Sequence, residues 1–299
     1  MLSNILLLIL SFELYATGPE ASTTAASFLK IGVGPRPVGM GGAFCAIADD
    51  GSALFWNPAG IGLMKEKELT CIYNILFEDT GHSILGYVHP IRGQAFGVGI
   101  NHLTISGIGE VTEEDPTGTE RTFEVQDIAC SLSYGRRFGK DLSLGMNLKY
   151  IQQRIEREKA TGYGVDVGML YKPSALGLGL AVQNIGPEIK FIERGFPLPL
   201  NFKAGISYPY KNFCFVLDAN KPIDKGVAFS LGAESWWAKI LTLRAGYKIE
   251  TQDNRLRGLV GMTGGIGLNL GDLRVDYAFT PFGDLGNIHQ ISLNFSFKK

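Results

Sequence analysis

The stretch from Gly32 to Gly62, GVGPRPVGMGGAFCAIADDGSALFWNPAGIG, contains the residues of this sequence that most invite a chemical interpretation. Its glycines could allow the close backbone approach that a phosphate group needs. However, Pro35 and Pro37 remove two amide donors where a phosphate would bind, and no buried strand precedes the glycines. The chain also contains no G-x-x-x-x-G-K-[ST] sequence. These observations argue against a nucleotide site.

The other residue types that bind metals or act as nucleophiles are scattered along the chain. No C-x-x-C, H-x-x-x-H or H-E-x-x-H spacing occurs, and no serine, histidine and acid set gathers at one predicted rim. We therefore expect no metal site, no cofactor and no catalytic residue, so the chain is predicted not to be an enzyme. The scattered residues are Cys45, Cys71, Cys130, Cys214, His82, His89, His102 and His289.

Composition narrows the class of protein further. The net charge of −1 gives no basic surplus for nucleic acid, and 39 of 299 residues are glycine, about twice the usual share. The longest uncharged apolar run, Ile5 to Phe12, is shorter than the roughly 20 residues of a membrane helix. With the residues up to Ala16, this run predicts a signal peptide over residues 1–16. A first buried strand or helix is the alternative.

From Leu69 onward, apolar and polar residues alternate with the period of a strand that has one apolar face. In DLSLGMNLKYIQ, residues 141–152, the leucines, Met146 and Tyr150 share one face. The alternation predicts about fourteen strands. They cover residues 69–78, 82–91, 94–103, 124–137, 141–154, 161–172, 176–184, 200–210, 213–220, 227–237, 241–250, 257–270, 273–282 and 288–298.

The predicted strands and their connections indicate a barrel in a membrane. Most strands run about 9–14 residues, which suits a tilted crossing of a bilayer. Short joints such as GKD and YK alternate with longer ones such as TISGIGEVTEEDPTGTERT, which is typical of outer-membrane barrels. The predicted fold is therefore all-β, an antiparallel transmembrane barrel over residues 67–299.

Aromatic residues are expected at both ends of this barrel, where an interfacial girdle would lie. The alternative is the aromatic core of a soluble β-protein. The short-turn girdle is predicted from Phe138, Tyr171, Tyr208, Tyr210, Trp236, Trp237, Phe295 and Phe297, and the loop-end girdle from Phe77, Tyr150, Tyr247, Phe279 and Phe282.

Charged residues occupy the strand face opposite the apolar one. Because charges are costly against lipid, we expect them to line the lumen and to pair with one another. A structural network is favoured over a catalytic role. The predicted lumen-lining residues are Lys149, Asp166, Lys203, Asp218, Glu234, Arg244, Arg274 and Asp276.

The barrel also explains the opening stretch. Residues 17–66 are too rich in small residues to form a core of their own, so we expect a plug of short helices and turns inside the lumen. Asp49 or Asp50 is expected to cap a helix from Ala53 to Trp56. The plug and its junction with the wall are predicted from Gly39, Met40, Gly41, Gly42, Asp49, Asp50, Trp56, Asn57, Pro58 and Gly60. A ligand-binding role for Trp56 is the alternative.

The same stretch resembles the N-terminal signature of the PorV/PorQ family, which belongs to the FadL-like outer-membrane barrels. That signature has a G-x-R-x-x-G-M-G-G-A run, an Asp-Asp pair and a W-N-P-A-G close. The resemblance implies a location in the outer membrane of a Gram-negative type of bacterium. It also implies either inward passage of hydrophobic compounds past a plug or a role in protein secretion or surface attachment.

Three functions therefore stay open, with outer-membrane lipid and either a hydrophobic small molecule or a secreted protein as partners, and no nucleic acid. A channel for hydrophobic compounds should have an apolar pocket and a gap in the wall, expected near Pro90, Gly93, Gly97 and Gly99. A secretion partner should have a sealed wall and a broad loop surface. The third possibility is a structural β-protein or an enzyme in barrel form.

Overall fold

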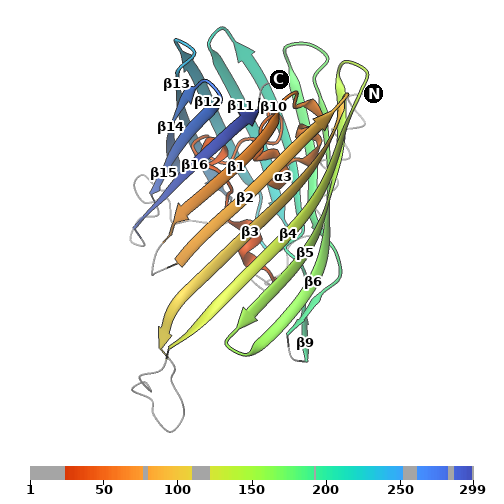
Figure 1. The fold of residues 1–299 in the computed structure, drawn as a ribbon, viewed down its shortest axis with the longest axis vertical. Helices are drawn as coiled ribbons and strands as arrows, with labels where there is room; N and C mark the ends of the chain where they lie inside the picture. The colour runs from red at the N-terminus through yellow and green to blue at the C-terminus, as the bar shows by residue number, and fades with distance from the viewer. Residues whose placement is uncertain are drawn as a thin grey trace.

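The computed structural model describes residues 24–76, 80–109, 122–191, 193–251, 261–281 and 286–297. Fourteen strands form one closed antiparallel barrel, in which β1 (Lys67–Ile75) pairs with both β2 and β16 (Asn287–Phe297) (Figure 1). The predicted fourteen-stranded barrel is confirmed. The other wall strands are β2 (Thr80–Ile91), β3 (Gln94–Gly109), β4 (Thr122–Phe138), β5 (Leu142–Ile155), β6 (Glu158–Tyr171), β7 (Gly177–Ile185), β10 (Asn201–Tyr210), β11 (Phe213–Pro222), β12 (Ala228–Trp237), β13 (Leu241–Glu250), β14 (Met262–Leu270) and β15 (Leu273–Pro281).

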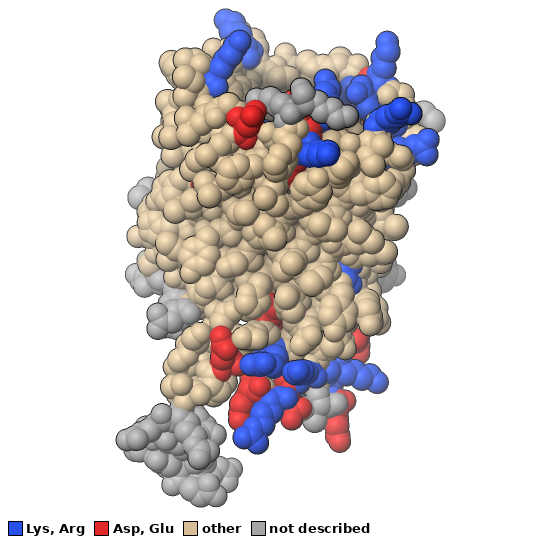
Figure 2. All heavy atoms as spheres, viewed as in Figure 1, with Lys and Arg blue, Asp and Glu red and all other residues tan. Residues whose placement is uncertain are grey.

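The barrel exposes apolar side chains and buries polar ones. On β5, Leu144 and Leu148 are 40% and 46% exposed, whereas Asn147 is fully buried. The same alternation recurs around the wall, so the polar face of each strand points into the lumen. On the face shown in Figure 2, charged residues gather at the two ends and leave an uncharged belt between them.

The two ends of the barrel differ in their connections. We call the end with tight turns, such as the turn between β10 and β11, the short-turn end; it is at the top of Figure 1, where β16 finishes. The opposite end, the loop end, carries the connection between β7 and β10. That connection contains an unpredicted hairpin of β8 (Ile189–Phe191) and β9 (Arg194–Phe196). Its three-residue strands are too short to show an alternation that sequence could reveal.

The expected gap in the wall near Pro90 is not found. Strands β2 and β3 pair without interruption from Thr80 opposite Ile105 to Ile91 opposite Gln94. Gly97 and Gly99 instead face inward and leave room for Leu54 and Phe55. The irregular pairings lie elsewhere, between β3 and β4 at residues 105–108 and between β6 and β7 at residues 165–167.

Most of the N-terminal segment, residues 24–66, lies inside the barrel (Figure 1), and Lys65 and Glu66 are exposed at its end. It contains η2 (Ser27–Lys30), α2 (Pro35–Val38), α3 (Ala53–Trp56) and η3 (Pro58–Leu63). The largest of its fully buried side chains are Met40, Phe44, Leu54 and Ile61. None of the helices in the described ranges has the length and composition of a membrane-spanning helix. The predicted signal peptide, residues 1–16, lies outside the described residues, as do Phe77 and Phe282.

Candidate functional site

Arg36 is the residue through which the N-terminal segment meets the charged wall. Gly34 has a φ of 94°, which favours glycine, and turns the chain into α2 just before Pro35. The two prolines fix the backbone on either side of Arg36. The Arg36 side chain is thereby directed at β12, where two of its guanidinium nitrogens donate to Glu234. The Nε–Oε2 distance is 2.9 Å and the Nη2–Oε1 distance is 3.0 Å.

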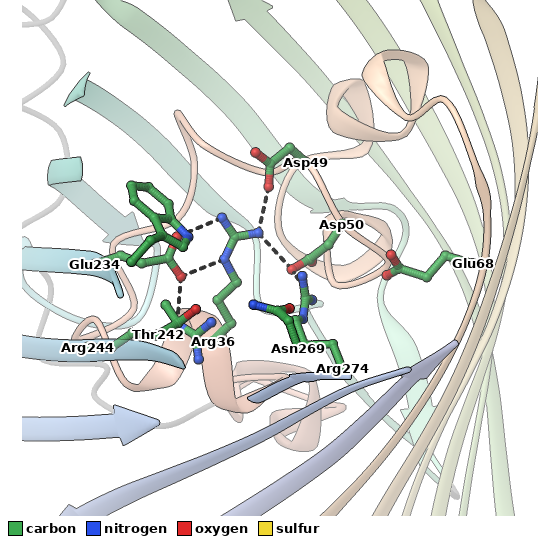
Figure 3. Close-up of a pocket in the computed structure, with 10 residues that line it drawn as sticks. Arg36, Asp49, Asp50, Glu68, Glu234, Thr242, Arg244, Asn269 and Arg274 are labelled. Carbon is green, nitrogen blue, oxygen red and sulfur yellow. Dashed lines mark hydrogen bonds and ion pairs between the residues drawn. The ribbon is translucent and has the colours of Figure 1, made fainter. Parts of the chain in front are cut away.

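Six side chains form a closed ring of alternating charge, which we call the ionic ring. Figure 3 shows five of them and leaves out Asp276. Arg36 Nη1 donates to Asp50 Oδ2 at 2.9 Å, and Arg274 Nη2 donates to the same oxygen at 2.7 Å. Arg274 and Arg244 then donate to the two oxygens of Asp276, at 2.8 and 2.7 Å. Arg244 Nε closes the ring on Glu234 at 2.6 Å. The ring therefore joins α2 and the loop before α3 to β12, β13 and β15.

The ionic ring is buried, so each charge depends on its partners. Burial would lower the pKa of Arg36, but Asp49, Glu234 and Asp50 outweigh it and hold that pKa well above its usual range. Burial would raise the pKa of Asp50, but Arg274 and Arg36 outweigh it and hold that pKa below its usual range. Both residues of the N-terminal segment are therefore charged at neutral pH, which favours attachment to the wall.

A polar cavity of about 320 Å³ adjoins the ionic ring at the short-turn end. Within the described ranges, no group of three or more histidine, cysteine, aspartate or glutamate residues is placed to hold a metal ion. Because the ring arginines and carboxylates neutralise one another, the arrangement is suited to holding the segment in place. The cavity is lined by Arg36, Asp49, Asp50, Glu68, Glu234, Trp236, Thr242, Arg244, Asn269 and Arg274.

A second contact lies at the Trp56–Pro58 turn. Asn57 is fully buried; its Nδ2 donates to Cys45 O at 2.9 Å and Met169 O at 3.2 Å, and its Oδ1 accepts from Ala59 N at 3.2 Å. Trp56 Nε1 donates to Val33 O at 2.7 Å. Pro58 begins η3. The turn thus binds both its own segment and the backbone of β6.

Wall side chains satisfy other backbone groups of the N-terminal segment. Asp218 Oδ2 accepts from the N–H groups of Phe44 and Cys45, each at 2.7 Å. Gln183 Nε2 donates to Phe55 O at 2.8 Å, and Ser143 Oγ donates to Ala59 O at 2.7 Å. Because short helices leave many backbone groups unpaired, these polar wall residues replace the partners that longer helices would supply.

Close backbone contacts explain the small residues of the segment. Gly41 has a φ of 69° and lies so close to the Tyr247 backbone that a Cβ would stand 2.9 Å from its nitrogen. A Cβ on Gly39 would stand 3.1 Å from Gly265 Cα. Gly42 also has a positive φ, and Gly60 is buried against the Ala48 carbonyl. Larger residues would push the segment away from the wall.

The other predicted lumen residues form separate contacts away from the ionic ring. Lys149 Nζ lies 2.8 Å from Asp166 Oδ2 and donates to Asn184 Oδ1 at 2.6 Å. Lys203 Nζ lies 4.2 Å from the centroid of the Trp56 ring. The predicted lumen set is therefore divided among the ionic ring, the Lys149–Asp166 pair, Lys203 beside Trp56, and Asp218 at the backbone of Phe44 and Cys45.

Two expectations at residue level were wrong. Neither Asp49 nor Asp50 is the N-cap of α3; the N-cap is Ser52, whose side chain makes no capping hydrogen bond. Asp49 is instead paired with Arg36, and Asp50 Oδ1 accepts from Ser52 N before the helix begins. Trp236 lines the polar cavity instead of joining an outer aromatic girdle.

Sequence reasoning missed Arg36, Glu68, Gln183 and Asn184 as contact residues. Arg36 carried a usable signal, because an arginine among small residues needs acidic partners once it is buried. Glu68 Oε1 accepts from Gly51 N at 2.7 Å, but its place at the start of β1 resembles that of an exposed residue. The amide residues carry no sequence signal that separates them from other polar lumen positions.

The loop end of the lumen holds an apolar cluster, whereas the short-turn end holds the ionic ring. Phe28 of η2 packs there with Ile151 of β5 and with Ile189 and Leu198 of the β7–β10 connection. Ala25 N donates to Pro197 O at 2.9 Å, and Lys30 Nζ donates to Asp224 Oδ2 at 2.7 Å. The buried members of this apolar cluster are Ala26, Phe28, Leu103, Ala129, Ile151, Ala160, Ile189 and Leu198.

Residues 17–163, about half of the chain, match the model of an uncharacterised protein family, UPF0164. Two proteins of Treponema pallidum (strain Nichols), each described as "UPF0164 protein", are 26% identical to the chain over 174 and 164 residues. These matches cover 54% and 50% of the chain, and 44% and 50% of the relatives. The chain thus spans about half the length of these curated relatives.

Solved structures resemble the whole barrel. The CymD monoaromatic hydrocarbon channel has a TM-score of 0.67 at 15% identity, covering 90% of this chain and 98% of that one. The toluene transporter TbuX of Ralstonia pickettii has a TM-score of 0.62 at 15% identity, with 89% and 99% covered. A Pseudomonas aeruginosa FadL homologue has a TM-score of 0.58 at 13% identity, with 88% and 98% covered. The chain therefore has the FadL-like barrel fold.

Proposed function

We propose that the protein is an outer-membrane channel for small hydrophobic molecules, with residues 17–66 as its plug. The observation that carries the membrane location is the outward apolar face of a closed barrel whose charges turn inward. Exposed leucine, valine and phenylalanine side chains around the wall would be unfavourable in water and are favourable in lipid. The ionic ring and the Asn57 turn hold the plug at the short-turn end.

Two observations support hydrophobic molecules as the substrate class. The apolar cluster around Phe28 and Ile151 lies at the loop end of the lumen, where a substrate from outside would first enter. The structures with the same fold include proteins described as a monoaromatic hydrocarbon channel and a toluene transporter. At 15% identity, the likeness of this chain to these proteins is a likeness of fold.

The entry route that we propose is the seam between β6 and β7. Residues 158–164 of β6 pair with β5, whereas the pairing of β6 with β7 begins only at Val165 and shifts at Val167. Side chains of the β7–β10 connection cover the unpaired part of β6: Ile189 lies against Gly162, and Leu198 against Gly164. Movement of this connection would open the wall beside the apolar cluster.

A disulfide across this seam tests the proposal. A Cβ placed on Gly162 lies 3.8 Å from Ile189 Cβ, which is a suitable separation for a disulfide. After the four native cysteines are replaced by serine, the Gly162→Cys, Ile189→Cys variant is reconstituted in liposomes. We expect toluene influx to fall when the disulfide forms and to return on reduction. Each single-cysteine variant is the control and should respond to neither treatment.

Unchanged influx in the oxidised double variant would rule out the seam as the route. Influx no faster than through protein-free liposomes, in the variant with neither new cysteine, would rule out the channel itself. Both outcomes require that the barrel has folded, which circular dichroism checks.

Two observations favour a second function, a barrel component of a protein secretion or surface-attachment system, as the PorV/PorQ resemblance implies. The first is that the cavity beside the plug is polar. The second is a larger apolar hollow of about 520 Å³ on the outer wall beside Tyr208 and Leu231. Purification in mild detergent separates the two functions. A copurifying small hydrophobic compound supports the channel, whereas a stoichiometric protein partner without toluene influx supports secretion.

A further inference from the structure

The short-turn end carries a rim of positive charge that the plug and the lumen network do not use. Its turns and outer strand ends hold nine basic residues and three acidic ones among the residues that the structure describes. Figure 2 shows Lys and Arg side chains projecting at this end, above the uncharged belt. The basic rim consists of Lys65, Lys67, Arg92, Arg136, Arg137, Lys140, Lys172, Lys211 and Lys239; the acidic residues are Glu66, Asp141 and Asp272.

The charges of the basic rim are not paired within the part of the chain that the structure describes. None of its nine residues forms an ion pair with another described residue. The loop end differs, because three of its basic residues are paired there: Lys30 with Asp224, Arg157 with Glu156, and Lys248 with Glu250. At the loop end the other basic side chains are interspersed with acidic ones (Figure 2), so the excess of positive charge lies at the short-turn end.

Aromatic rings fix the depth of two of these cations. The Arg136 guanidinium carbon lies 5.2 Å from the centroid of the Phe138 ring, and Lys211 Nζ lies 5.4 Å from that of Tyr210. Phe138 and Tyr210 are 45% and 51% exposed at the edge of the apolar belt. Aromatic rings in this position lie at the level of lipid headgroups, and the cations beside them reach toward the polar side.

We propose that the basic rim binds the phosphate groups of anionic phospholipids in the leaflet at the short-turn end. This inference rests on the membrane location in the proposed function. Anionic headgroups attract basic residues at a membrane surface, and the charged phosphate accepts strong hydrogen bonds from arginine and lysine. Because the basic rim borders the apolar belt, it lies beside lipid headgroups all around the barrel. A soluble polyanion would not contact the rim all around the barrel.

Spin-labelled lipids test this binding directly. The barrel is reconstituted in phosphatidylcholine vesicles with trace spin-labelled phosphatidylglycerol or phosphatidylcholine, and electron paramagnetic resonance measures the lipid immobilised at the protein. We expect at least about a threefold preference for phosphatidylglycerol, reduced in 0.5 M NaCl by screening. Neutralising four rim residues (Arg136→Gln, Lys140→Gln, Lys211→Gln, Lys239→Gln) should remove the preference.

The matched control neutralises four basic residues at the loop end: Lys159→Gln, Lys190→Gln, Arg194→Gln and Lys225→Gln. This variant should keep the preference. Equal immobilisation of both lipids by the wild-type barrel would overturn the inference while leaving the membrane location intact, as would an equal loss in the loop-end variant. If no lipid of either kind is immobilised, the membrane location and the lipid-binding rim both fail. Should the fourfold rim variant not fold, Lys211→Gln alone should lower the preference measurably.

Discussion

At the residue scale, the ionic ring makes Arg36 the most consequential charge of the N-terminal segment. Replacing it by glutamine leaves Asp50 and Glu234 with one arginine partner each, inside a buried site. Removing one partner of a buried ion pair usually costs about 3–5 kcal/mol. We therefore expect Arg36→Gln to lower the free energy of unfolding, measured by urea titration in lipid vesicles, by about 3 kcal/mol.

The control for this variant is Lys248→Gln, which breaks an ion pair with Glu250 whose side chains are 41% and 38% exposed. Exposed pairs contribute about 0–1 kcal/mol, so this variant should unfold close to the wild-type midpoint. Equal effects of the two substitutions would show that burial of the ionic ring does not determine its contribution.

At the level of elements, η2 is attached to the β11–β12 connection at the loop end. Lys30 Nζ and Thr24 Oγ1 both donate to Asp224 Oδ2, at 2.7 and 3.1 Å. Burial would raise the pKa of Asp224, but the hydrogen bond and charge of Lys30 outweigh it and lower that pKa. A lowered pKa means that this contact stabilises the fold above the usual aspartate pKa, near 4, and is lost as the pH falls through the lowered value.

We therefore expect acid to release η2. A nitroxide attached at position 27 of a Ser27→Cys variant should become more mobile as the pH falls below about 4, measured by electron paramagnetic resonance. Asp224→Asn should give the mobile spectrum already at pH 7, whereas Asp272→Asn, at the short-turn end, should not. A wild-type spectrum for Asp224→Asn at pH 7 would contradict the role of this ion pair.

At the scale of the whole molecule, the two faces of the wall should meet different solvents. Ile266 points outward and is 40% exposed, whereas Asn269 on the same strand lines the polar cavity. In lipid vesicles, a nitroxide at position 266 should collide more with dissolved oxygen, and one at position 269 more with a water-soluble nickel chelate. The reverse order would mean that the barrel does not lie in the bilayer with its apolar face outward.

Alternation of apolar and polar residues along the chain predicts the fourteen wall strands and the apolar face of each, because this alternation is a local property. In β5, the side chains of Leu144 and Asn147 point to opposite faces as a consequence of strand geometry alone. The sequence also placed the charged residues on the inner face. The extent of the N-terminal plug and the role of its junction with the wall stay predictions.

Which of those charges meet depends on the folded barrel, because the partners are far apart in the sequence. Arg36 and Glu234 are 198 positions apart and become neighbours only when the barrel closes and α2 enters it. Each lumen strand presents similar polar residues, so local sequence could not say that Glu234 joins the ionic ring while Asp166 pairs with Lys149. The basic rim likewise depends on the closed barrel, which brings distant turns to one end. The seam beside Gly162 depends on how the β7–β10 connection packs on β6.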